Sequence, residues 1–232
     1  MRACEKKGIP VVVLDRPNPI SNTVEGPILN PDYRSFVGLH PIPVRHGKTI
    51  GELAQQFKRE AFPNCELYVL PMEVYDPTAY FEDTRLPWVL PSPNMPTVDT
   101  AVVYPGMCLF EATNVSEGRG TSRPFELFGA AWIRAQDFCD KLNRENLPGV
   151  WFREAYFQPT FHKFSGQLCG GAQMHITDRK SFLPFHTAVV VLNNLRRDYP
   201  ETFRWKEPPY EYEYHKLPIE ILIGGPLASV FP

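Results

Sequence analysis

The segment from Thr113 to Phe125 concentrates polar side chains between two apolar stretches. Gly118 and Gly120 interrupt any helix or strand there, and glycine lets a ligand approach the main chain closely. We therefore predict a binding loop rather than a linker, with a turn whose polar groups satisfy one another as the alternative. The candidate site residues of this loop are Asn114, Ser116, Glu117, Arg119 and Thr121.

Glu117 is the carboxylate that the sequence favours for a catalytic role in proton transfer, because it lies in this glycine-containing loop. Glu25 is the second candidate. Glycosidases often use two carboxylates, and the sequence spacing leaves open whether any two of these approach each other. A serine-centred triad at Ser116 also stays open, although no Gly-x-Ser-x-Gly motif surrounds this serine.

A second set of polar residues, Asp15, Arg16 and Asn18, directly follows the apolar run Val11–Leu14. Ligands in open α/β sheets bind beyond the carboxyl ends of the strands, so these side chains are predicted to bind substrate. The alternative is structural: Asp15 pairs with Arg16 or caps a neighbouring helix.

Arg45 and His46 precede the predicted helix that begins after Thr49, and a helix N-terminus favours anions. His46 is predicted to be a catalytic acid/base group or a donor to substrate, and the alternative is a hydrogen bond to a carbonyl group. Ser92 and Asn94 lie in a proline-rich corner, which is predicted either to bind substrate at a domain junction or to serve only as a linker.

The overall composition excludes several classes of protein. The 232 residues carry a formal net charge of -2 without a basic cluster, so no nucleic-acid partner is expected. No apolar run reaches the roughly 18 residues that a membrane span needs, and the N-terminus lacks the apolar stretch of a signal peptide. The five cysteines and six histidines show no metal-binding spacing, so a metal site is not expected.

The first part of the chain has a strand–helix–strand pattern. Apolar runs at Val11–Leu14 and Leu67–Leu70 flank a helix that begins after Thr49 and ends near Glu60, which is typical of an α/β layer. A two-stranded parallel sheet cannot cover both of its faces. We therefore expect residues 1–93 to be the C-terminal half of a Rossmann-like domain whose first half is missing.

The remaining residues, 94–232, show no regular alternation of strands and helices and are predicted to form a smaller mixed α+β domain. The expected helices are residues 98–104, 133–146 and 183–199, and the expected strands are residues 150–157, 173–176 and 220–223.

Several long motifs resemble the NamZ-type DUF1343 family, in the same order along nearly the whole chain. These motifs are Val12-Val-Leu-Asp-Arg-Pro-Asn-Pro19, Val24-Glu-Gly-Pro27, Ser35-Phe-Val-Gly38, Pro43-Val-Arg-His-Gly47, Gly51-Glu-Leu-Ala54, Pro91-Ser-Pro-Asn-Met-Pro-Thr97, Thr113-Asn-Val-Ser-Glu-Gly-Arg-Gly-Thr121, Arg123-Pro-Phe-Glu126, Tyr210-Glu-Tyr-Glu-Tyr214 and Lys216-Leu-Pro-Ile219. The resemblance implies a Rossmann-like domain followed by a smaller mixed domain, with the active site in the cleft between them.

The resemblance also implies a function: a glycoside hydrolase that removes terminal N-acetylmuramic acid from peptidoglycan fragments, without a cofactor, in bacteria that often secrete the enzyme or hold it in the periplasm. The family's active-site glutamate motif has no counterpart here, and Lys48 and Arg85 replace a usual methionine and glycine. The expectation is thus an inactive fragment of such an enzyme. The alternatives are a non-catalytic cell-wall saccharide-binding or scaffolding module and a nucleotide-binding enzyme, and the absence of a Gly-x-Gly-x-x-Gly motif disfavours the latter.

Overall fold

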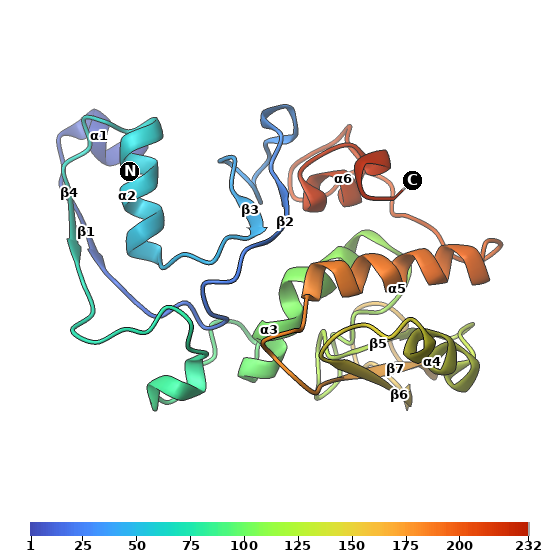
Figure 1. The fold of residues 1–232 in the computed structure, drawn as a ribbon. Coiled ribbons are helices and arrows are strands. Elements are labelled where there is room, and N and C mark those ends of the chain that lie inside the picture. The colour runs from blue at the N-terminus through green and yellow to red at the C-terminus, as the bar shows by residue number, and fades with distance from the viewer. Residues whose placement is uncertain (232) are drawn as a thin grey trace. The chain divides into compact units, whose positions relative to one another are not determined.

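The computed structural model describes residues 1–231, which form a mixed α/β fold of small sheets and helices (Figure 1). The chain divides into two compact units. Unit 1 comprises Met1–Val24 and His46–Trp88, and unit 2 comprises Glu25–Arg45 and the chain from Val89 onward. The predicted domain division at residue 93 stays a prediction.

Unit 1 contains the predicted strand–helix–strand arrangement. Strands β1 (Val11–Leu14) and β4 (Leu67–Leu70) are parallel, and helix α2 (Ile50–Ala61) connects them. The side chain of Thr49 accepts from Glu52 N, and Glu52 accepts from Thr49 N, so a complete capping box starts α2. Helix α1 (Arg2–Lys7) ends at Gly8, whose φ of 62° gives the left-handed conformation of a C-terminal cap.

One face of this two-stranded sheet is covered and the other is exposed. Along both strands half-buried and exposed residues alternate, and the exposed side chains are Val12, Leu14, Tyr68 and Leu70. The apolar run Val11–Leu14 predicted a strand covered on both faces, and unit 1 alone does not provide that cover. The Rossmann-like description of this unit therefore stays a prediction.

Arg85, which follows the 3-10 helix η2 (Phe81–Thr84) in unit 1, has a φ of 60°. Only glycine adopts this left-handed conformation without a steric cost. A glycine at this position would therefore avoid that cost.

Unit 2 is built on an antiparallel sheet in the order β5-β7-β6, with β5 at Leu127–Ala130, β6 at Val150–Phe157 and β7 at Cys169–Ile176. Helix α4 (Ala135–Arg144) packs on one face of the sheet (Figure 1). The aromatic core at this face centres on Phe128, whose ring lies 6.3 Å from the rings of both Phe138 and Phe152.

Two further helices of unit 2, α3 (Val98–Met107) and α5 (Pro184–Asp198), pack closely against each other. A Cβ atom on Gly106 would lie 1.9 Å from the carbonyl oxygen of Pro184, so this contact requires glycine. The predicted end of this helix at residue 104 was wrong: α3 continues through Pro105 to Met107 and then tightens into the 3-10 helix η3 (Cys108–Ala112). Burial of nearly the whole helix outweighs the hydrogen bond that proline cannot make.

The expected strand at residues 220–223 was also wrong, because these residues end helix α6 (Pro218–Ile223). Pro218 suits the first helical turn, and Gly224, with a φ of 70°, ends the helix.

Unit 2 also contains the antiparallel pair β2 (Glu25–Ile28) and β3 (Pro43–Arg45), and the 3-10 helices η1 (Pro31–Tyr33) and η4 (Leu227–Ser229). No helix within residues 1–231 is long and apolar enough to cross a membrane.

Candidate functional site

The polar loop of unit 2 is tightly ordered around its two glycines. Gly118 has a φ of 75° and Gly120 a φ of 82°. A Cβ atom would lie 2.4 Å from the carbonyl oxygen of Leu127 at Gly118, and 2.7 Å from the backbone of Phe161 at Gly120. Both positions therefore require glycine, for conformation and for space.

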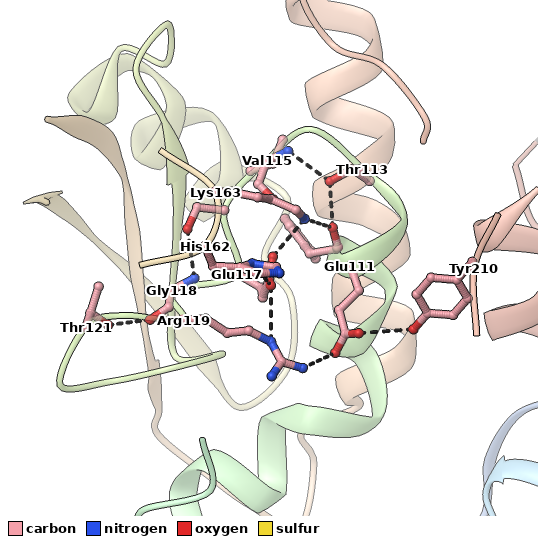
Figure 2. A network of polar contacts seen from close by, with 12 residues as sticks. Glu111, Thr113, Val115, Glu117, Gly118, Arg119, Thr121, His162, Lys163 and Tyr210 are labelled. Carbon is pink, nitrogen blue, oxygen red and sulfur yellow. Dashed lines mark hydrogen bonds and ion pairs between the residues drawn. The ribbon is translucent and has the colours of Figure 1, made fainter. Parts of the chain in front are cut away.

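Glu117 lies at the centre of this loop with no exposed surface and meets three basic side chains (Figure 2). Its carboxylate lies 2.8 Å from Lys163 Nζ, 3.1 Å from His162 Nδ1 and 3.2 Å from Arg119 Nε. Together these four residues form a polar cluster that Glu111 and Tyr210 extend, and we call the six residues the Glu117 cluster.

Lys163 fixes the inner side of the Glu117 cluster. Its ammonium group also donates to the carbonyl oxygens of Phe110, at 2.7 Å, and Val115, at 2.9 Å. Burial lowers the pKa of Lys163 to about 8, although the attraction of Glu117 opposes this shift. Burial by itself raises the pKa of Glu117, but Lys163 outweighs it and holds this pKa below its ordinary value. Glu117 is therefore a charged group that orients its neighbours and a poor proton donor.

Arg119 is the member of the Glu117 cluster whose geometry suits ligand binding. Its Nη2 donates to Glu111 Oε1 at 2.7 Å, and its guanidinium lies 5.0 Å from the ring centre of Phe125. Glu111 Oε2 in turn accepts from Tyr210 Oη at 3.0 Å (Figure 2). Among residues 1–231, Nη1 of Arg119 takes part in no hydrogen bond or ion pair, and 24% of the side chain is exposed. A fixed guanidinium with an open edge can bind a carboxylate.

His162 is the other exposed member, with 42% of its side chain accessible. Burial of part of the ring lowers the pKa of His162, and Glu117 opposes this shift. The imidazole adds a hydrogen-bonding group beside Arg119, because the carboxylate of Glu117 holds both side chains.

The other predicted residues of the loop use their side chains to hold the backbone. Asn114 donates to Thr202 O at 2.8 Å and accepts from Arg204 N at 2.9 Å. Ser116 accepts from Gly118 N at 3.2 Å, and Thr121 donates to Gly118 O at 2.6 Å. These contacts support the structural alternative for the three side chains, and their predicted part in substrate binding stays untested.

Asp15, in unit 1, caps helix α2. Its Oδ1 accepts from Gly51 N at 2.8 Å, and its Oδ2 accepts from Thr49 Oγ1 at 2.9 Å. The carboxylate thus compensates the unpaired N–H groups at the start of the helix. The exposed Arg16 donates from Nη1 to the carbonyl oxygen of Asp15 at 2.8 Å.

Asn18 and His46 hold the same region of unit 1. The buried Asn18 side chain donates to Lys48 O at 3.1 Å and accepts from Ile20 N at 3.1 Å. His46 Nδ1 accepts from Lys48 N at 3.0 Å, which leaves the proton of a neutral ring on Nε2. Burial lowers the pKa of His46, with a smaller effect of the Lys48 charge, so the ring is neutral at pH 7 and can donate from Nε2.

Arg45 and Glu25 face each other across the β2–β3 pair of unit 2. Oε1 of Glu25 accepts from His186 N at 2.8 Å, at the start of α5. Burial raises the pKa of Glu25, and the bond to His186 and the charge of Arg45 only partly offset this shift. Glu25 is therefore better able than Glu117 to hold a proton.

Ser92 is exposed and Asn94 is half-buried in the proline-rich corner of unit 2, where Met95 N donates to Ser92 O at 2.9 Å. The family resemblance implies an active site in a cleft between two domains. Arg16 and His46 lie in unit 1, whereas Asn94 and Glu117 lie in unit 2, so a site that they share stays a prediction. Within residues 1–231, no three His, Cys, Asp or Glu side chains come together as a metal site would need.

The sequence prediction missed Glu111, His162, Lys163 and Tyr210. Lys163 is 46 residues from Glu117 in the chain, and Tyr210 is 99 residues from Glu111. The only local signal is the adjacent His162-Lys163 pair between two phenylalanines. A buried glutamate needs a counter-charge, and a basic pair in an aromatic segment can supply it.

The family of the chain follows from two family models. The model for the N-terminal part of the exo-β-N-acetylmuramidase NamZ matches residues 1–99, and the model for its C-terminal part matches residues 102–229. The chain belongs to this family. The family resemblance predicted from the sequence motifs is confirmed.

Similar proteins agree with this assignment. The peptidoglycan β-N-acetylmuramidase NamZ of Bacillus subtilis (strain 168) is 52% identical over 206 residues, which are 88% of this chain and 50% of the relative. A DUF1343 family protein of Bacteroides fragilis NCTC 9343 has a crystal structure that matches 99% of this chain and 60% of its own, with 28% identity and a TM-score of 0.88. A second such protein from the same strain has 29% identity and a TM-score of 0.70, over 98% of this chain and 59% of its own. The chain thus spans about half the length of the curated relative.

Proposed function

We propose that this chain acts on peptidoglycan as part of an exo-β-N-acetylmuramidase, a glycoside hydrolase that releases terminal N-acetylmuramic acid from cell-wall fragments. The 52% identity to a peptidoglycan β-N-acetylmuramidase carries this proposal. The Glu117 cluster supports it, because the sugar that distinguishes such a substrate carries a lactyl carboxylate.

In this proposal, Arg119 binds that carboxylate through the open edge of its guanidinium group. Glu117 and Glu111 hold the other edges of the guanidinium, so little side-chain freedom is lost on binding. His162 also contacts the carboxylate of Glu117. When its imidazole ring is protonated, it donates to the bound anion, and when the ring is neutral, it makes a polar contact to a hydroxyl group of the sugar. Glu117 is a positioning residue here and makes no contact with the sugar.

Non-catalytic saccharide binding is the second candidate function. One observation favours it: both carboxylates of the Glu117 cluster are engaged by basic or hydroxyl groups, and Glu117 is fully buried. Neither group is suited to give a proton to a leaving group. Glu25, whose pKa is raised by burial, is the carboxylate of unit 2 best suited to that step.

The two functions are separated by measuring binding and turnover on the same β-linked N-acetylmuramic acid–N-acetylglucosamine disaccharide. Release of free N-acetylmuramic acid by the chain supports hydrolysis, whereas binding without release supports the binding module. Arg119→Lys keeps the charge but loses the planar fork, so we expect affinity for the disaccharide to fall about tenfold. The matched control is Arg153→Lys, at an exposed position of strand β6 outside the Glu117 cluster. Equal affinities of wild type and Arg119→Lys would contradict the assigned role of Arg119.

A further inference from the structure

Two aromatic side chains of unit 2 stand unusually far out of the surface. The exposed fraction is 76% for Tyr212 and 69% for Phe36. Their rings meet edge to face, with centres 5.3 Å apart. The exposed Val37 and Leu39 lie next to Phe36 in the chain. We call the two rings the aromatic platform.

The turn that carries Tyr212 is held in a costly conformation. Tyr210 N donates to Glu213 O at 2.9 Å and Glu213 N donates to Tyr210 O at 2.9 Å, so a two-residue turn joins them. The two central residues, Glu211 and Tyr212, have φ values of 45° and 67°. Turns of this kind favour Asn-Gly, and a bulky residue at positive φ is an outlier. Such strain is typical of functional positions.

One contact fixes this turn to the rest of unit 2, and local hydrogen bonds support it on the other side. On one side, the Tyr210 hydroxyl group donates to Glu111, which binds Arg119, so the turn is continuous with the Glu117 cluster (Figure 2). On the other side, the Glu213 carboxylate accepts from the N–H groups of Tyr214 and His215. The ring of Tyr212 is therefore held at the surface before any ligand arrives.

The segment that carries Phe36 is fixed in a similar way. Lys216, which follows the turn, donates to the carbonyl oxygen of Asp32, and its ammonium group lies 5.2 Å from the ring centre of Tyr33. This contact ties residues 32–33 to the chain that follows Tyr212. The two halves of the aromatic platform thus have a common anchor.

We propose that the aromatic platform binds a pyranose ring of the cell-wall glycan by stacking on the ring of Tyr212, which Phe36 supports edge to face, as a sugar subsite separate from the carboxylate contact at Arg119. This inference rests on the proposed function. A flat, pre-ordered ring buries the apolar face of a sugar at little entropic cost, and a polar cluster next to it pairs with the hydroxyl and acid groups of the saccharide. The hydrogen bond between Tyr210 and Glu111 connects the turn that carries Tyr212 to the Glu117 cluster. This connection to a site for polar groups favours a saccharide over a protein partner.

The test is co-sedimentation of the purified chain with peptidoglycan sacculi. Tyr212→Gly removes the ring and relieves the strained φ, so it separates binding from folding. We expect sacculus binding about tenfold weaker than in wild type, with a melting temperature that is unchanged or raised by about 2 °C. Tyr212→Trp keeps a ring and should bind within about twofold of wild type. Tyr156→Thr, at another exposed tyrosine in strand β6, is the matched control and should bind like wild type.

Three results would overturn the platform: no sedimentation of the wild-type chain with sacculi, full binding by Tyr212→Gly, or binding that protease treatment of the sacculi abolishes. The last result would identify a protein partner instead. The assay is independent of hydrolysis. Loss of sacculus binding in Tyr212→Gly supports the platform even if the wild-type chain releases no sugar, and release of sugar supports the proposed function even if the platform fails.

Discussion

The ammonium group of Lys163 lies 2.8 Å from a carboxylate oxygen of Glu117, and Glu117 has no exposed surface. Two charges this deeply buried stabilise a fold only as a pair, because either one alone keeps its desolvation cost without compensation. The pair therefore holds segments 111–121 and 160–164 together and fixes the position of Arg119.

Glu117→Gln should lower the stability of the chain markedly, because Lys163 and Arg119 lose their shared counter-charge. We expect a loss of about 3 kcal/mol in the free energy of unfolding, the order found when one partner of a buried ion pair is removed. This corresponds to a fall of about 6 to 12 °C in the melting temperature measured by calorimetry.

A double-mutant cycle provides the control. Lys163→Met alone leaves Glu117 buried with fewer partners, whereas Glu117→Gln/Lys163→Met removes both charges. The double variant should lose about 1 to 3 kcal/mol less than the sum of the two single changes. Additive losses would show that the two residues act independently, and Glu201→Gln, at an exposed residue, should change the melting temperature far less than Glu117→Gln.

Lys163 also predicts an unusual rise of stability at alkaline pH. Its pKa is about 8 in the folded chain, against an ordinary value of 10.5, because burial outweighs the attraction of Glu117 and Glu111 and Lys206 adds repulsion. Between these two values the unfolded chain holds more protons, so the contribution of Lys163 to the free energy of unfolding rises with pH. Below pH 8 both states are protonated and this contribution is constant.

The measurement compares wild type with Lys163→Met by urea denaturation at pH 7.5 and pH 10. The difference in unfolding free energy between them should grow at the higher pH in favour of wild type, by up to about 3 kcal/mol. Other groups that titrate in this range are common to both chains and cancel in the difference. A difference that stays constant or shrinks would show that the Lys163 pKa is not lowered.

Sequence patterns predicted the helices and strands that are determined by neighbouring residues in the chain. The capping box at Thr49 and Glu52 begins α2, and the apolar runs on either side of it form β1 and β4. The strands β2, β3 and β5 were not predicted, because they are short, contain Gly or Pro, and exist through pairing with distant segments. The run at residues 220–223 was predicted as a strand because a short apolar run does not distinguish a strand from a buried helix.

The candidate site shows the same division. The glycine loop and its glutamate were predicted from residues 113–125, but the lysine and tyrosine that complete the Glu117 cluster come from segments far along the chain. Sequence spacing carries no information about such contacts. Sequence spacing also could not show that the side chains of Asn114 and Ser116 form hydrogen bonds with the backbone.

Asp15→Ala should affect stability more than binding, because Asp15 caps α2 through Gly51 N and Thr49 Oγ1. We expect a loss of about 1 to 2 kcal/mol in the free energy of unfolding, the order of a helix cap with a favourable charge. Arg16→Ala, at the adjacent exposed residue, should change it by less than about 0.5 kcal/mol. Unchanged stability with weaker saccharide binding in Asp15→Ala would show instead that the carboxylate binds the ligand.

The exposed face of the β1–β4 sheet predicts self-association of the isolated chain. Val12 pairs with Tyr68 and Leu14 with Leu70, so four exposed apolar side chains lie on one face of unit 1. Apolar side chains grouped in this way favour contact with another molecule over contact with water. In sedimentation velocity, the wild-type sedimentation coefficient should rise with protein concentration, and Val12→Lys should remove most of this rise. The matched control is Val89→Lys, at an exposed valine of unit 2, which should associate like wild type. A wild-type coefficient that is independent of concentration would refute the prediction, as would equal association of wild type and Val12→Lys.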